Sequence, residues 1–176
     1  HRDLHTAYRR QRQMCIRDRR HKLATSSLEE LAEGGFESVI DDPIKNKKKV
    51  VKIILCSGKV YYHLLEARDE KKIKNIAIIR IEQLYPFPDI EMDNILKKYS
   101  HVESIIWCQE EPRNQGAWYN SQHFLRAAVG RLSEDLSLDY CGRASSAAPA
   151  SGYMSVHLDE QRRLLMRHLK QSKWVK

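Results

Sequence analysis

Apolar runs with few polar interruptions recur along the chain. The clearest are residues 50–56 (VVKIILC), 76–81 (IAIIRI) and 103–109 (ESIIWCQ), with a shorter run at 136–142 (LSLDYCG). Because both alternating faces of these runs are largely apolar, the pattern predicts strands that are covered on both sides of a sheet.

Amphipathic stretches separate and follow these predicted strands. Their ranges are 59–72, 88–100, 116–130 and 155–170. In the second stretch, Met92, Ile95, Leu96 and Tyr99 recur at i, i+3, i+4 and i+7, which predicts a helix with one buried face. The third helix is expected to end at Gly130.

Two serines mark expected helix starts. Ser26 is followed three residues later by Glu29, a spacing typical of a capping box, so residues 26–35 predict a short helix that Gly34 and Gly35 close. Ser155 is expected to cap the last helix, with Asp159 in its first turn.

The alternation of strands and helices predicts an α/β three-layer sandwich, with a parallel or mostly parallel sheet between two helical layers. Its crossover connections are expected to be right-handed. We divide the chain into an extension outside the fold (1–19), a lead-in segment with the short helix (20–47) and the α/β domain (48–176).

The net charge of +8 is concentrated at the amino terminus. Residues 1–20 hold seven Arg and two Asp, a net of +5, which leaves +3 for the rest of the chain. That remainder is ordinary for a soluble domain, so we expect no nucleic-acid partner. Residues 1–19 resemble the peptide translated in error from sequencing-adapter DNA; a basic arm and a disordered extension are the alternatives.

Membrane insertion and metal binding find no support in the sequence. There is no run of about 18 apolar residues, so we expect no membrane span. The four cysteines form no CxxC unit and the eight histidines show no zinc-ligand spacing, so we expect no metal site. Cys56 and Cys108 end apolar runs, where reduced, buried thiols are expected.

Two adjacent carboxylates, Glu110 and Glu111, follow the third predicted strand in the stretch WCQEEPRNQGAW. Neighbouring residues of a strand point to opposite faces, so the pair is expected to end the strand rather than to share a substrate as acid and base. Pro112 is expected to stop the strand pairing here. Strand carboxyl ends are nevertheless where open α/β sheets bind ligands.

The turn CSGK offers a candidate anion site. Ser57 and Gly58 follow the first strand, and Lys59 begins the next helix. Backbone N–H groups and a lysine at such a turn suit an anion, although Ser57 acting as a plain helix cap explains the turn equally well. Walker A, GxGxxG, GxSxG and HExxH patterns are absent from the sequence.

Six stretches in order carry a resemblance to a known family. They are SSLEEL, CSGKVYY, RIEQLYPFP, WCQEEPRNQGAW, YCGRASSAAPASGYMSVH and the closing helix. Over about residues 20–170 the chain resembles the carboxyl-terminal domain of the E1 component of 2-oxoglutarate dehydrogenase. Residues 1–19 do not fit this resemblance, and because the chain begins with His1 we expect a piece of a longer protein.

The resemblance implies a transketolase C-terminal-like fold with a mostly parallel five-stranded sheet and one antiparallel edge. It implies an enzyme that decarboxylates 2-oxoglutarate and passes the succinyl group to the lipoyl-bearing E2 succinyltransferase. The thiamine diphosphate and Mg²⁺ of such an enzyme belong to upstream domains, so no catalytic residue is assigned to this chain and we expect it to be inactive alone.

The resemblance also implies a homodimer, and in some members an effector site for AMP or acetyl-CoA. The residues matching that region are Ser57, Lys59, Gln109 and Arg143. Trp107 and Trp118 are expected to anchor the turn by burial, while Glu110 and Glu111 fix it or pair across a subunit contact. The implied compartment is the bacterial cytoplasm, or the mitochondrial matrix in a eukaryote.

A second function class stays open, namely a stand-alone α/β module that binds an anion or a nucleotide at CSGK. Such a module should be monomeric and bury its large aromatic residues internally. A piece of a larger enzyme should instead expose apolar surface where other domains belong.

Overall fold

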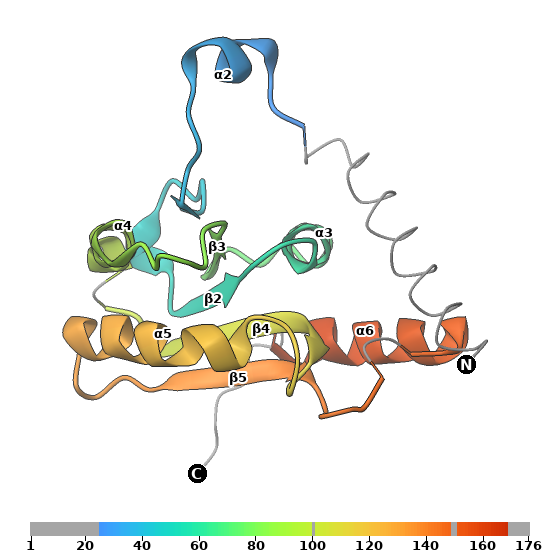
Figure 1. Cartoon of the computed structure of the whole chain (residues 1–176). Coiled ribbons are helices and arrows are strands. Elements are labelled where there is room, and N and C mark those ends of the chain that lie inside the picture. The colour runs from blue at the N-terminus through green and yellow to red at the C-terminus, as the bar shows by residue number, and fades with distance from the viewer. Residues whose placement is uncertain (1–24, 100, 149–150, 169–176) are drawn as a thin grey trace.

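The computed structural model describes residues 25–99, 101–148 and 151–168 (Figure 1). The extension predicted at residues 1–19 lies outside the described residues. In chain order the elements are α2 (Leu28–Glu33), β1 (Val39–Ile40), η2 (Lys47–Lys49), β2 (Lys52–Cys56), α3 (Val60–Glu70), β3 (Ile76–Ile81), α4 (Asp89–Leu96), η3 (Lys97–Tyr99), β4 (Ser104–Pro112), α5 (Trp118–Leu132), β5 (Leu138–Arg143) and α6 (Met154–His168).

The five strands form one sheet in the order β1-β3-β2-β4-β5. The pairs β3–β2, β2–β4 and β4–β5 are parallel, and β1 runs antiparallel to β3 at one edge. The predicted fold class, a mostly parallel five-stranded sheet with one antiparallel edge, is therefore confirmed.

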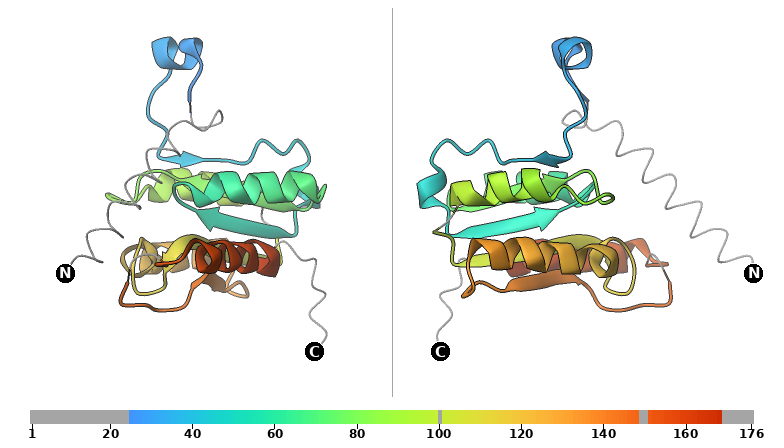
Figure 2. Two further views of the ribbon diagram at one scale, coloured as in Figure 1. Left: turned by 90° about the vertical axis from the view of Figure 1, so that its right-hand side faces the viewer. Right: turned by 60° about the vertical axis from the view of Figure 1, so that its left-hand side comes forward.

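Helices cover both faces of this sheet (Figure 2). The strand alternation sends Ile53 and Leu55 into a core beneath α4 and α5, and sends Ile54 and Cys56 into a second core beneath α3 and α6. The two cores explain why the strand sequences are apolar throughout, and they confirm the predicted three-layer sandwich.

The second core contains a row of cysteines. Cys56 pairs in register with Cys108, and Cys108 pairs in register with Cys141, so three thiols lie side by side across β2, β4 and β5. All three are buried, and none of them forms a disulfide. Burial raises the pKa of Cys56, and a hydrogen bond with Cys141 together with burial raises the pKa of Cys108, which keeps Cys56 and Cys108 protonated.

The amphipathic helices bury the predicted faces. Met92, Leu96 and Tyr99 are all at most 1% exposed, and Trp118 and Leu125 of α5 are buried in the same core. The sequence predicts that this helix ends at Gly130, and that prediction is wrong. The helix continues to Leu132, because that side chain still packs against the first core.

Three predicted helix caps are wrong in detail. The capping box joins Ser27 and Glu30, not Ser26 and Glu29, and Gly34 ends the helix. Lys59, not Ser57, precedes α3, and no side chain caps that helix. Ser155 lies inside α6, since the helix begins at Met154, so Asp159 lies beyond its first turn.

Strand β4 also runs further than predicted. The pairing with β5 becomes irregular between Cys108 and Pro112, and Pro112 is paired with Arg143. Arg113 N–H donates to the Arg143 carbonyl at 3.1 Å, so the next residue supplies the donor that proline lacks.

The segment before β2 contributes to the sheet through a buried ion pair. Asp42 accepts a hydrogen bond from the guanidinium of Arg68 on α3 and a second from the Ile78 N–H of β3 at 2.7 Å. Strand β1 precedes this aspartate within the predicted lead-in segment, and the boundary after residue 47 stays a prediction. No helix in the described ranges is long and apolar enough to span a membrane.

Candidate functional site

The candidate site lies where the strand order reverses direction. β2 leads into α3 on one face of the sheet, whereas its neighbour β4 leads into α5 on the other face. The carboxyl ends of such neighbouring strands leave a crevice, which is the usual ligand position in open α/β sheets. A pocket of about 570 Å³ opens at this point.

Three connections, one strand end and one helix build the walls of this pocket, which we call the switch-point pocket. The connections are the β2–α3 turn, the residues after β3 and the β4–α5 turn, and the end of β4 and the first turns of α5 complete the walls. The lining residues are Ser57, Gly58, Leu84, Tyr85, Trp107, Gln109, Glu111, Gly116, Ala117, Asn120, Ser121 and Phe124.

Two glycines shape the backbone around the pocket. Gly58 has φ +71° and Gly116 has φ +67°, conformations that side-chain-bearing residues rarely adopt. A methyl group at Gly116 would lie 3.1 Å from the Glu111 carboxylate, so this glycine also leaves room for that side chain.

The side chain of Gln109 forms hydrogen bonds with several residues around the pocket. Its side-chain oxygen accepts hydrogen bonds from Trp107 Nε1 and from the Trp118 backbone N–H, each at 3.1 Å. Its amide nitrogen donates to the carbonyls of Pro112 and Gln115 at 3.1 and 2.8 Å. Gln109 thus positions the turn that leads into α5, and its side chain already has a full set of partners.

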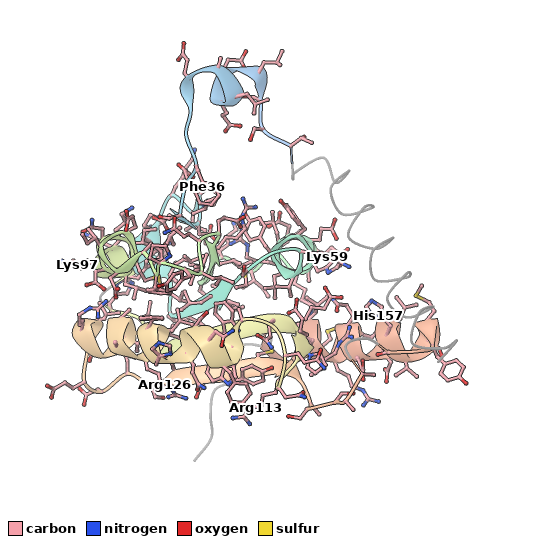
Figure 3. The ribbon with its side chains drawn as sticks, viewed as in Figure 1. Phe36, Lys59, Lys97, Arg113, Arg126 and His157 are labelled. Atoms are coloured by element: carbon pink, nitrogen blue, oxygen red, sulfur yellow. The ribbon has the colours of Figure 1, made fainter. Side chains whose placement is uncertain are left out.

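The cations Lys59 and Arg143 lie on the other side of β4, together with α6. Lys59 Nζ is 3.7 Å and Arg143 Nη2 is 3.8 Å from Glu110 Oε1. The Arg143 guanidinium also donates to His157 Nδ1 at 3.0 Å, and its Nε is 3.5 Å from a Glu160 oxygen. Lys59 and His157 are seen on the same side of the molecule in Figure 3.

His157 is held neutral in this cluster. Burial lowers its pKa, and the positive charges of Arg143 and Lys59 lower it further, outweighing the opposing effect of Glu110. A neutral imidazole can accept the Arg143 hydrogen bond at Nδ1, whereas an imidazolium cannot.

The structure therefore divides the four sequence-predicted ligand residues into two pairs. Ser57 and Gln109 line the switch-point pocket, whereas Lys59 and Arg143 meet at Glu110 on the α3 and α6 side. Their joint role in binding an effector stays a prediction.

Glu110 and Glu111 occupy opposite sides of the strand end, as strand alternation predicts. Glu110 faces Lys59 and Arg143, and Glu111 lines the switch-point pocket beside Gly116. The two carboxylates therefore do not face a common substrate position.

Trp107 and Trp118 are both buried, at 0% and 1% exposure. The Trp118 ring packs on Tyr140 of β5 with ring centroids 4.8 Å apart, and the Arg126 guanidinium lies 5.7 Å from the Trp118 ring. This packing anchors the start of α5, in keeping with the expected burial of both tryptophans.

Sequence reasoning missed the α6 contribution to the cluster around Glu110. His157, Glu160 and Gln161 stand at i, i+3 and i+4, so they share one helical face, and that spacing could have revealed a polar face directed at the sheet. The aromatic residues Tyr85 and Phe124 of the pocket were missed because no local sequence pattern shows that the loop after β3 lies beside the second turn of α5.

The fold and the polar strand ends define the class of protein: an α/β domain with a ligand-type crevice at a topological switch point. The comparison with known families is specific. The family model described as 2-oxoglutarate dehydrogenase C-terminal matches residues 25–169, and the chain belongs to that family.

Curated relatives agree with this assignment. The chain is 50% identical over 147 residues to the 2-oxoglutarate dehydrogenase E1 component of Azotobacter vinelandii, covering 83% of this chain and 16% of that protein. It is 50% identical over 147 residues to that of Haemophilus influenzae, covering 83% of the chain and 15% of the relative. It is 45% identical over 152 residues to that of Rickettsia typhi, covering 85% of this chain and 16% of the relative.

Proposed function

We propose that the chain is the carboxyl-terminal part of an E1 subunit of the 2-oxoglutarate dehydrogenase complex. Such an E1 decarboxylates 2-oxoglutarate with thiamine diphosphate and transfers the succinyl group to the lipoyl arm of an E2 succinyltransferase. The supporting observation is the identity of 50% to relatives carrying that name, of which the chain covers 16%. The compartment we propose is the bacterial cytoplasm, or the mitochondrial matrix in a eukaryote.

Thiamine chemistry is not assigned to the described residues. Within them, no three His, Cys, Asp or Glu side chains come together as a site that could hold a metal ion. We propose that the cofactor belongs to the remaining length of the longer relatives, and we derive no catalytic step from this domain.

The role that we propose for the domain is subunit assembly as a homodimer. Large apolar side chains support this role: Leu28 and Leu31 of α2 are 81% and 71% exposed, and Phe36 after it is 76% exposed. The helix stands clear of the sheet in Figure 1. Exposed apolar groups of this kind mark surfaces that another polypeptide covers.

An effector role is proposed for the cations at the strand ends. Lys59 and Arg143 would bind the phosphates of AMP or acetyl-CoA, with Ser57 at the adjoining turn, and Gln109 would hold the turn in position. The phosphate would replace Glu110, the carboxylate that now lies near both cations.

Replacing Lys59 tests the effector role. Lys59→Ala should weaken AMP binding by about tenfold, the loss expected for one charge-assisted contact, while leaving the urea midpoint nearly unchanged. Isothermal titration of the chain with AMP and acetyl-CoA measures this, and exposed Lys45→Ala is the control. Equal AMP affinity for Lys59→Ala and the parent chain would remove Lys59 from the site.

A chimera tests the main proposal. Residues 25–169 replace the matching segment of the Azotobacter vinelandii E1 component, and the purified chimera is assayed for 2-oxoglutarate-dependent ferricyanide reduction. We expect activity within about tenfold of the parent enzyme, because the domain would supply the same assembly surfaces. The controls are the parent and the same enzyme with the segment deleted. A folded, dimeric chimera without activity would contradict the proposal.

A further inference from the structure

The charge of the switch-point pocket separates it from the proposed effector site. Among the described residues that line the pocket, Glu111 carries the one formal charge, and none is a lysine, arginine or histidine. Lys59 and Arg143 belong to the cluster at Glu110 instead. A phosphate or carboxylate in the pocket would therefore meet a negative charge and no cation at its walls.

Glu111 is available to a ligand. It is exposed, and within the described part of the chain it forms no ion pair, whereas Glu110 beside it faces Lys59 and Arg143. Its carboxylate is directed toward Gly116, where a Cβ would lie 3.1 Å from Oε2. The absence of a side chain at Gly116 thus keeps one edge of the carboxylate open within the pocket wall.

Aromatic side chains line the same pocket as this carboxylate. Phe124 is fixed by a stacked contact with Phe87, with centroids 5.2 Å apart and planes 7° apart. Tyr85 is 86% exposed at the pocket, and buried Trp107 also lines it. A pocket lined by both a carboxylate and aromatic rings can attract an organic cation, through charge pairing with the carboxylate and cation–π contact with a ring.

Neutral polar groups limit what else the ligand can carry. Ser57 and Asn120 line the pocket, while the Gln109 amide is occupied by the tryptophan and backbone partners already described. The volume of about 570 Å³ lies in the range of small-molecule sites. A ligand of modest size with a flat or apolar body and one positive group matches these walls.

We propose that the switch-point pocket binds a small organic cation, an amidinium, guanidinium or amine on a flat body, with its charge on Glu111 and its body against Tyr85 and Phe124. The proposed effector site shares Ser57 and Gln109 with this pocket, but its two cations, Lys59 and Arg143, lie on the opposite side of β4. The pocket would bind a cation, whereas the proposed effector is an anion that binds at the same end of the sheet.

Benzamidine is a suitable probe, because benzamide has the same shape without the charge and benzoate reverses it. Each is titrated into the full chain while the backbone and indole N–H signals are followed by NMR. We expect benzamidine to shift the signals of Trp107, Gly116 and Phe124, with benzamide at least about tenfold weaker, the loss expected when one charge-assisted contact is removed. Benzoate should leave these signals unchanged.

Glu111→Gln should weaken benzamidine binding by about tenfold while the rest of the spectrum is retained. Glu103→Gln, at an exposed glutamate just before the opposite end of β4, is the matched control and should bind like the parent.

Several outcomes would overturn the proposal: no benzamidine shifts in the pocket, equal affinity for benzamide, stronger binding of benzoate, or unchanged affinity in Glu111→Gln. Tighter binding of N-acetyl-arginine amide than of benzamidine would also overturn it, because the pocket would then suit an arginine of another polypeptide. None of these readouts depends on dehydrogenase activity or on AMP, so they are separate from the tests of the proposed function.

Discussion

The side chain of Gln109 bonds to the residues on both sides of the turn that it organises. It accepts from Trp107 and Trp118 and donates to carbonyls of residues 111, 112 and 115. The stretch WCQEEPRNQGAW therefore owes its shape to the glutamine and the two tryptophans rather than to its pair of glutamates. Buried polar groups in such a network are costly to leave without partners.

Trp118 provides the sharpest test at the residue scale. Trp118→Ala should lower the free energy of unfolding by about 3–5 kcal/mol, because it removes a buried ring packed on Tyr140 and leaves a cavity. Urea unfolding followed by circular dichroism measures this. Tyr119→Ala is the control, since that neighbouring side chain is 54% exposed. An unchanged midpoint for Trp118→Ala would mean that the ring is not buried.

The sequence predicts residues well where one local pattern decides the outcome. The run at 76–81 matches β3 residue for residue, because continuous β-branched apolar sequence between polar ends suits a central strand. The capping box is displaced by one position because Ser26 and Ser27 each have a glutamate three residues later. The two-residue strand β1 is too short to leave a periodic signal of its own.

At the scale of elements, α6 depends on a polar seam as well as on apolar packing. Leu164 enters the second core, while Gln161 bonds to His63 of α3 at 2.8 Å and His157 bonds to Arg143 of β5. The helix therefore closes one face of the sheet partly through groups whose charge depends on pH.

His157 should make the docking of α6 sensitive to acid. Its pKa is lowered in the folded chain, so between its ordinary value of about 6.5 and the lower folded value the unfolded chain binds more protons. The contribution of His157 to the free energy of unfolding is then fully present above about pH 6.5, and it decreases as the pH falls through that window. The facing groups are Arg143 and Lys59, which oppose protonation, and Glu110 and Glu160, which favour it.

The comparison of urea midpoints at about pH 7.5 and about pH 5.5 tests this expectation. His157→Gln should lose less stability on acidification than the parent, because glutamine does not titrate. His101→Gln, at an exposed position, should keep the parental pH dependence. The same pH dependence in all three chains would show that His157 does not link α6 to pH.

Across the whole molecule, the Asp42–Arg68 pair connects the chain before β2 with α3 and β3. Both partners are nearly buried, with side-chain exposures of 1% and 7%. The pattern of apolar residues does not predict this contact, because an aspartate in a lysine-rich turn is expected to be solvated. The long-range pairing that buries it is a property of the assembled sheet.

Asp42→Ala should lower the free energy of unfolding by about 3–5 kcal/mol, because it leaves the Arg68 charge buried without its partner. Adding Arg68→Met should restore part of that loss, since the uncompensated charge is then removed. Urea unfolding of the single and double variants measures both effects, and exposed Asp135→Ala is the control. Strictly additive losses would mean that the two side chains do not interact in the folded chain.

The labelling rates of the buried cysteines can report how often parts of the fold open. Cys141 Sγ lies 4.0 Å from the Leu164 carbonyl, so an external thiol reagent can reach Cys141 only when α6 departs or the strands separate. The labelling rate of Cys141 would then report how often α6 leaves the sheet, and that of Cys56, which shares the second core with Val60 and Leu64 of α3, how often α3 leaves it. A chain whose α6 loosens in acid should show the first rate rising well before the second.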